Sequence, residues 1–265
     1  LFAFDVIHGH RTIFPVPLGE AAAWDPKAAE EAAAVAAREA AATGLKWTFA
    51  PMVDIARDAR WGRVVEGAGE DVCLGSALAS ARVRGFQGPD PSRPDRVMAC
   101  AKHWVAYGAA EAGRDYNTVD LSERTLREVY FPPFQAALQA GAGSVMSAFN
   151  DLSGVATSGN PWTLTEVLRE EWKFDGVVVS DYESVRELIP HRQAADEAEA
   201  AQMGLGSGVD IEMVSRLYNR HLPRLVAEGK VPLAVVDEAV RRMLRVKFRL
   251  GLFERPYVDE TLEAR

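Results

Sequence analysis

An uninterrupted β-branched run that ends in a carboxylate is the feature that most constrains how this chain folds. Residues 167–175 have the pattern of a helix, Gly176 breaks it, and the valines 177–179 lead through a serine to Asp181. Such a run is typical of a strand buried on both faces of a parallel sheet. Because side chains alternate along a strand, the first and third valines share a face with Asp181. The pattern predicts a carboxylate at the carboxyl end of a central strand, where α/β barrels collect their catalytic residues.

Further strand-like segments alternate with helical patterns along the rest of the chain. Strands are predicted at 1–5, 47–51, 96–103, 144–149 and 209–213, and helices at 26–42, 72–87, 161–172, 193–203, 214–228 and 233–250. This alternation predicts an α/β fold with a parallel sheet. We expect a (β/α)8 TIM-barrel-like fold whose first two strands would precede Leu1. A doubly wound open sheet is the alternative, although no glycine-rich phosphate loop follows any strand.

Composition narrows the class of ligand. The 265 residues are 48% hydrophobic, which is enough for one large α/β domain, and no apolar run is long enough to span a membrane. A formal net charge of -8 without basic clusters argues against nucleic acid and anionic membranes as partners. Cys73 and Cys100 lack metal-ligand spacing, so we expect two core residues and no metal or cofactor. The start inside an apolar run indicates a cut in a longer protein.

Polar residues follow several of the predicted strands. Asp5 ends the first strand, Lys102 and His103 end the third, and Arg63 lies in the long polar loop 54–71, where alternating charges indicate an ordered ion-pair network. Each residue also has a structural interpretation. Lys102 fits a solvated strand end, His103 a core histidine, Arg63 an ion pair with a loop glutamate, and Asp181 a helix cap.

Five motifs, in this order along the chain, together resemble glycoside hydrolase family 3, and within it the periplasmic-type β-glucosidases. They are Phe4-Asp5-Val6-Ile7-His8-Gly9, Arg60-Trp61-Gly62-Arg63 with Glu66 and Gly69-Glu70-Asp71, Lys102-His103, Val145-Met146-Ser147-Ala148-Phe149-Asn150, and the segment from Gly176 to Asp181. The resemblance implies that residues 1–265 are part of the family's amino-terminal barrel domain. It also implies that the carboxy-terminal α/β sandwich domain is absent from these residues.

The resemblance further implies a retaining exo-β-glucosidase, which hydrolyses terminal non-reducing β-D-glucosyl residues of a β-glucoside or oligosaccharide through a covalent glycosyl-aspartate. Asp181 would be the nucleophile. Carried over by position, Asp5 would accept hydrogen bonds from sugar hydroxyls, and Arg63, Lys102 and His103 would donate to them. We expect Lys102 and His103 also to keep Asp181 ionised. Met146 would line the pocket and Tyr182 would stack on a sugar face. We interpret His8, His10, Glu66, Glu70 and Asp71 as scaffold.

No motif in this chain identifies the general acid that the mechanism needs. A retaining glycosidase needs a second carboxyl group roughly 5 Å from the nucleophile to protonate the leaving oxygen. The resemblance implies that the missing carboxy-terminal domain provides it, and it suggests a periplasmic or secreted protein. Glu111, Asp115 and Glu183 lie near site motifs in sequence, but no feature distinguishes one of them as the acid.

Three other functions remain open on the sequence. The chain fits a non-catalytic sugar-binding or inert fragment, because the acid is unassigned. A β-xylosidase or β-N-acetylglucosaminidase of the same family is a second possibility. The third is a Schiff-base aldolase barrel that uses Lys102, although this chemistry leaves the Asp181 and Arg63 motifs unexplained.

Overall fold

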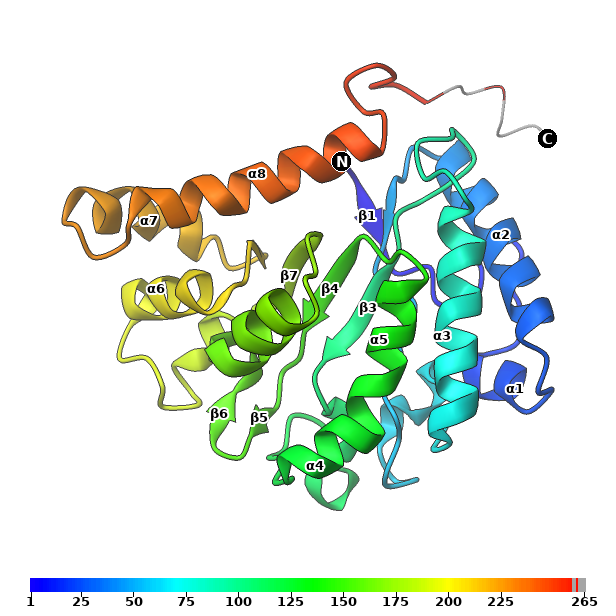
Figure 1. Cartoon of the computed structure of the whole chain (residues 1–265), viewed down its shortest axis with the longest axis horizontal. Helices are drawn as coiled ribbons and strands as arrows, with labels where there is room; N and C mark the ends of the chain where they lie inside the picture. The colour runs from blue at the N-terminus through cyan, green and yellow to red at the C-terminus, as the bar shows by residue number, and fades with distance from the viewer. Residues whose placement is uncertain (259–260, 262–265) are drawn as a thin grey trace.

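Six parallel strands form the centre of the molecule (Figure 1), a computed structural model that describes residues 1–258 and 261. They are β1 (Ala3–Phe4), β2 (Trp47–Thr48), β3 (Cys100–Trp104), β4 (Ser144–Ser147), β7 (Val177–Tyr182) and β8 (Ile211–Met213). β1 pairs with β2, and β3, β4, β7 and β8 form one ladder. The parallel bridges Trp47–Met98 and Met52–Lys102 join the two groups. The strands therefore follow one another in sequence order, as the alternating pattern predicts.

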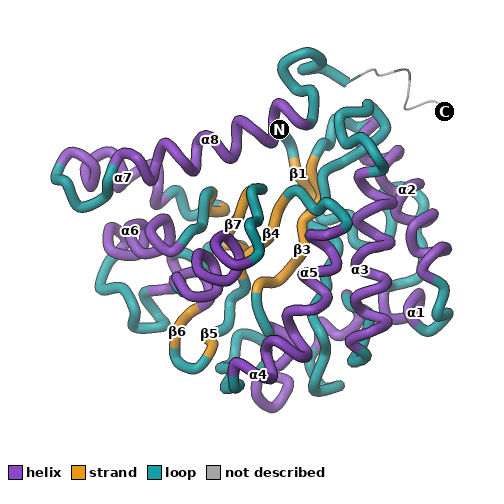
Figure 2. Tube along the Cα trace, in the orientation of Figure 1, coloured by secondary structure: helices purple, strands orange, loops and turns teal. Residues whose placement is uncertain are grey.

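Helices surround this sheet (Figure 2). The α-helices are α1 (Pro17–Ala21), α2 (Pro26–Ala42), α3 (Val72–Gln87), α4 (Glu123–Thr125), α5 (Phe131–Gln139), α6 (Glu197–Ser207), α7 (Leu217–Ala227) and α8 (Leu233–Arg249). Two wider helical segments are η4 (Leu126–Tyr130) and η6 (Trp162–Glu171), and short 3-10 turns are η1 (Gly62–Glu66), η2 (Tyr107–Ala109), η3 (Glu111–Gly113), η5 (Thr157–Gly159) and η7 (Arg186–Leu188). No described helix is both long and apolar enough to cross a membrane.

Local sequence explains where the longest early helices begin and why they pack closely. The Asp25 side chain accepts the backbone N–H groups of Lys27 and Ala28 at the start of α2. Asp71 caps α3 in the same way. A Cβ at Gly85 would lie 2.3 Å from the Glu30 carbonyl oxygen, so α2 and α3 approach each other to a distance that only glycine permits.

The core has two main parts, one on each face of the sheet. Inside the sheet, Met98, Cys100, Met146, Val177 and Val179 form one apolar cluster. Val145 and Val178, one residue out of phase, belong to the larger cluster beneath the helices. The alternation along β7 is therefore as predicted, and it directs Asp181 to the inner face at the carboxyl end of the sheet.

Two local features differ from expectation or are not predicted. Ser153 and Gly154, in a segment of turn composition, form the tight turn between β5 (Asp151–Leu152) and β6 (Val155–Ala156), and both have positive φ. The sequence does not predict these two strands, because strands of two residues show no periodicity. Cys100 is buried as expected, but Cys73 is exposed in the first turn of α3.

Candidate active site

Polar side chains gather at the carboxyl ends of the central strands. Asp5 directly follows β1, Lys102 and His103 belong to β3, and Asp181 lies near the end of β7. Because parallel strands end at one edge of a sheet, residues far apart in sequence meet here. Contacts within this group bring together Asp5, Arg63, Lys102, His103 and Asp181, as detailed below.

The Lys102 ammonium group forms an ion pair with Asp5. Lys102 Nζ donates to Asp5 Oδ1 over 2.7 Å. The lysine side chain is only 4% exposed, whereas the aspartate side chain is 57% exposed. A cation from the core thus holds a carboxylate that keeps acceptor positions open to solvent. A hollow of about 260 Å³ lies beside Asp5, bounded by apolar groups that include Val16 and Val65 and by Glu66.

The Arg63 guanidinium is fixed on several sides. Its Nε and Nη2 donate to the two oxygens of Glu66 over 2.6 and 3.0 Å. It lies 5.5 Å from the centre of the Tyr107 ring, which adds a cation–π contact. Nη2 is also 3.0 Å from His103 Nε2. The predicted ion-pair network of the loop is therefore present, and it holds Arg63 rigidly.

His103 is a neutral side chain enclosed by polar partners. Its backbone N–H donates to Asp54 Oδ2 over 2.9 Å, and its Nδ1 lies 2.8 Å from the same oxygen. Nδ1 therefore carries the proton, which leaves Nε2 as an acceptor for Arg63. Burial, reinforced by the charges of Arg63 and Lys102, holds the His103 pKa well below its usual value.

This arrangement changes the expected role of His103. Its Nε2 is 3.4 Å from Asp181 Oδ2, but that nitrogen already accepts from Arg63, so it has no proton to donate to Asp181. His103 is fully buried and contacts the site through Arg63. Asp54, which the sequence does not single out, orients the imidazole, and burial raises the pKa of its carboxyl. The only sequence signal for Asp54 is its position after the second strand.

Asp181 has one anchored oxygen and one free oxygen. Oδ1 accepts the Tyr182 backbone N–H over 2.6 Å. Oδ2 is buried and has no hydrogen-bond partner among the described residues. Burial raises the Asp181 pKa, while the Tyr182 N–H and the charges of Lys102 and Arg63 lower it. The site thus offers a carboxylate oxygen that is unpaired and stabilised by two cations.

The remaining predicted residues lie at different depths. Met146 is buried in the inner apolar cluster, and in the β4–β7 register it pairs with Val179, two residues before Asp181. Tyr182, directly after Asp181, is 58% exposed. Of the residues interpreted as scaffold, His8 Nδ1 is 2.9 Å from the Phe14 carbonyl oxygen. No group of three or more metal-ligating side chains occurs in the part of the chain that the structure describes.

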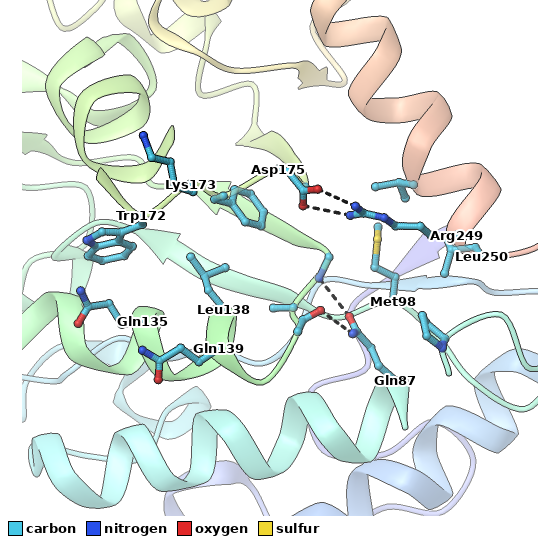
Figure 3. Close-up of a pocket in the computed structure, with 17 residues that line it drawn as sticks. Gln87, Met98, Gln135, Leu138, Gln139, Trp172, Lys173, Asp175, Arg249 and Leu250 are labelled. Carbon is cyan, nitrogen blue, oxygen red and sulfur yellow. Dashed lines mark hydrogen bonds and ion pairs between the residues drawn. The ribbon is translucent and has the colours of Figure 1, made fainter. Parts of the chain in front are cut away.

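Figure 3 shows a separate pocket, whose lining residues include those at the amino ends of β4 and β7. It has a volume of about 540 Å³ and is lined by Gly143 and Gly176, which precede β4 and β7, and by Trp172 and the pair Asp175 and Arg249. Arg249 donates to Asp175 over 2.6 Å at its rim. Because the candidate residues sit at the carboxyl ends of the strands, this pocket is not part of their site.

Comparison with known proteins gives one consistent family. Residues 1–246 match the model of the glycosyl hydrolase family 3 N terminal domain. A periplasmic beta-glucosidase of Salmonella typhimurium is 46% identical over 256 residues, which cover 97% of this chain and 34% of that protein. A putative beta-xylosidase of Formosa agariphila is 37% identical over 252 residues, covering 94% of this chain and 33% of that protein. The chain thus spans about a third of the length of these relatives.

Solved structures agree with the sequence relatives. A beta-glucosidase from Listeria innocua superposes with a TM-score of 0.95 at 47% identity, covering 97% of this chain and 36% of that chain. Its structure in complex with glucose gives a TM-score of 0.96 at 44% identity, covering 100% of this chain and 38% of that chain. These likenesses confirm the predicted (β/α)8-barrel-like fold.

Proposed function

Because this chain belongs to glycoside hydrolase family 3, we propose that it carries the nucleophile and sugar-binding residues of a retaining exo-β-glucosidase. The substrate is a terminal β-D-glucosyl residue of a β-glucoside or oligosaccharide. Relatives named beta-glucosidase support this choice. The observation that carries the proposal is the Asp181 carboxylate, whose Oδ2 is unpartnered and near two cations.

The chemistry follows from the two oxygens of Asp181. The Tyr182 N–H fixes Oδ1, so Oδ2 is free to attack the anomeric carbon. As the bond from this oxygen to carbon forms, the bond to the leaving oxygen breaks, and positive charge develops on the sugar ring. Water then attacks the same carbon, and Asp181 leaves as a carboxylate. Lys102 and Arg63 favour the ionised form in both steps, because their charges lower the Asp181 pKa.

Asp5, Lys102 and Arg63 are proposed to hold the sugar. The exposed Asp5 carboxylate retains acceptor positions beyond its contact with Lys102. The guanidinium of Arg63, which is fixed by Glu66 and His103, presents donors of defined direction. A pocket for a polyhydroxylated ligand needs both kinds of group in fixed geometry. Tyr182 adds an exposed ring for stacking.

A β-xylosidase is the second candidate, because relatives named beta-xylosidase are 37% and 38% identical to this chain. Xylose differs from glucose by the absence of the hydroxymethyl group. The aldolase alternative has less support, since the Lys102 ammonium is paired with a carboxylate at 2.7 Å, whereas a Schiff base needs a free amine.

Trapping of the covalent intermediate tests the proposal. The chain is incubated with dinitrophenyl 2-deoxy-2-fluoro-β-glucoside, and intact mass and peptide maps are recorded. The leaving group needs no proton, so a working nucleophile alone gives an adduct. We expect one fluoroglucosyl group on Asp181 and none on the Asp181→Asn variant. The matching fluoroxyloside, run in parallel, compares the two sugars.

Three results would change the assignment. An adduct on another carboxylate overturns Asp181 as the nucleophile. No adduct on protein with a native circular dichroism spectrum favours the non-catalytic sugar-binding or inert fragment. Faster labelling by the xyloside favours the β-xylosidase.

A further inference from the structure

Asp54 is a buried carboxyl group that binds His103 through one oxygen. The preceding Val53 N–H donates to the Lys102 carbonyl over 2.8 Å, which holds this segment against β3. Asp54 Oδ2 then accepts two N–H groups of His103, the backbone N–H over 2.9 Å and Nδ1 over 2.8 Å. Both residues are buried, so water does not compete for these contacts. Asp54 therefore fixes both the backbone and the ring of His103.

The other ring nitrogen of His103 faces the candidate site. Its Nε2 lies 3.0 Å from Arg63 Nη2 and 3.4 Å from Asp181 Oδ2. A guanidinium group only donates, so Nε2 is the acceptor in its contact with Arg63. This requires a neutral ring whose single proton is on Nδ1, where Asp54 accepts it. Two contacts, one on each ring nitrogen, thus select the same tautomer.

The opposite tautomer would disturb two residues of the proposed sugar site. With the proton on Nε2, the ring N–H would face the Arg63 Nη2 donor at 3.0 Å, and the two donors would repel each other. The same N–H would lie 3.4 Å from Asp181 Oδ2, which has no hydrogen-bond partner among the described residues. A hydrogen bond to a carboxylate oxygen stabilises its negative charge, which makes the oxygen a weaker nucleophile. The position of one proton on His103 therefore affects both Arg63 and Asp181.

We propose that Asp54 is a positioning residue that keeps the His103 proton on Nδ1. Nε2 then remains an acceptor that holds Arg63, and Asp181 Oδ2 is left without a donor. The inference rests on the proposed glycosidase function, in which this oxygen attacks the anomeric carbon. Asp54 acts through His103 and does not touch the sugar, so its substitution should change the state of the histidine ring as well as the rate.

Nitrogen NMR of the His103 ring measures the tautomer independently of activity. In an assigned long-range ¹H–¹⁵N correlation spectrum, the ¹⁵N shift distinguishes a ring nitrogen that carries the proton from one that does not. We expect the proton on Nδ1 in the unchanged chain. Asp54→Leu, which has a similar shape but no acceptor, should move the proton to Nε2. Asp54→Asn should keep it on Nδ1, because the amide oxygen replaces Oδ2 as the acceptor of the two N–H groups.

The rate of trapping links the tautomer to the nucleophile. The three proteins are labelled with dinitrophenyl 2-deoxy-2-fluoro-β-glucoside at several concentrations, which separates binding of the glycoside from the maximal rate of adduct formation. Asp54→Leu should lower the maximal rate roughly 10- to 100-fold, because Asp181 Oδ2 becomes hydrogen-bonded. It should also weaken binding, because Arg63 is displaced. Asp54→Asn should recover most of both losses.

Gln87→Leu is the matched control. The Gln87 side chain is also buried, and its Oε1 likewise accepts two N–H groups, that of Ala99 over 2.9 Å and that of Gly143 over 3.1 Å. These contacts lie at the amino ends of β3 and β4, away from the candidate site. The substitution thus removes the same kind of contact without touching His103. We expect lower stability, with the His103 proton still on Nδ1 and adduct formation at the normal rate.

Three results would overturn the inference. One is a proton on His103 Nε2 in the unchanged chain, a measurement that needs no variant to fold. Another is an Asp54→Leu chain with a native circular dichroism spectrum that keeps the proton on Nδ1, or that loses it and still forms the adduct at the normal rate. The third is slow labelling of Asp54→Asn with the proton on Nδ1. If the unchanged chain forms no adduct, the proposed function fails, whereas the NMR comparison still decides whether Asp54 places the proton.

Discussion

At the residue scale, the behaviour of Asp181 depends on the balance between burial and two cations. Its oxygen is removed from water, which favours the protonated form, and Lys102 and Arg63 favour the ionised form. His103 does not join them, because its neutral ring is committed to Asp54 and Arg63. The cation at Lys102 is therefore expected to control the pH at which the nucleophile becomes active.

We expect Lys102→Met to shift the acidic limb of kcat/KM to higher pH. Lys102 lowers the Asp181 pKa, so removing the charge raises that pKa, and the ionised nucleophile is lost at a higher pH as the solution is acidified. Loss of a charged hydrogen-bond donor should also lower kcat/KM at its optimum roughly 10- to 100-fold. The measurement is a pH profile on dinitrophenyl β-glucoside.

Lys27→Met is the control, because Lys27 is an exposed cation on α2 that forms an ion pair with Glu31 on the helix surface. Its pH profile should match that of the unchanged chain. An acidic limb that stays in place or moves to lower pH in Lys102→Met would show that Lys102 does not act on Asp181 through its charge.

At the element scale, one buried carboxylate ties β7 to helices on both sides. Asp210, directly before β8, accepts the Val178 N–H and Arg169 Nη2 on one oxygen over 2.8 and 2.7 Å. Its other oxygen accepts Arg242 Nη1 of α8 over 2.8 Å. The Asp210 side chain is almost fully buried, so no water replaces these contacts. This network fixes the strand that carries Asp181, the proposed nucleophile.

We expect Asp210→Ala to lower the free energy of unfolding by about 3–5 kcal/mol, because it leaves a buried arginine and a strand N–H unpaired. Asp175→Ala removes a matched but exposed pair with Arg249, whose side chains are 58% and 50% exposed. It should cost less than about 1 kcal/mol. Urea unfolding of the three proteins measures both changes. Similar losses in the two variants would contradict a structural role for the buried network.

Elements with strong local signals are well predicted from the sequence. The α2 and α3 helices match their predicted ranges, because Asp25 and Asp71 cap them and alanine-rich sequence favours them. The segment predicted as a helix from residue 193 begins only at Glu197, since Asp196 caps it there. The β5–β6 hairpin depends on pairing that a two-residue strand does not reveal in its pattern.

The residues of the candidate site also divide into those that the sequence identifies and those that it does not. Asp5, Arg63, Lys102, His103 and Asp181 are identified by motifs, and the structure brings them together. Asp54 is not, because its distinguishing features are its burial and its contacts with His103, a residue of another element. The tautomer of His103 likewise follows from two residues, one 49 and one 40 positions away. Such properties exist only in the folded chain.

At the scale of the whole molecule, large apolar side chains are exposed near the first strand of the sheet and on α8. β1 and β8 pair with β2 and β7, and within the described residues they are not paired with each other. Phe4 on β1 and Phe2, directly before this strand, are exposed. On α8, Val240, Leu244 and Phe248 recur every four residues and are 50%, 40% and 60% exposed. Open strand edges and apolar helix faces of this kind promote association between chains.

We therefore expect this chain of 265 residues to associate as its concentration rises, through the exposed face of α8. Sedimentation velocity over a range of concentrations should show a rising mean sedimentation coefficient. Phe248→Lys should suppress the rise, because it places a charge on the apolar face of α8 and removes the ring that packs against Phe253, with the ring centroids 4.3 Å apart. Ala234→Lys adds the same charge at an exposed position of α8 without removing apolar area, so it should behave like the unchanged chain. Equal association of all three proteins would place the contact elsewhere, with the exposed edge of β1 as the next surface to alter.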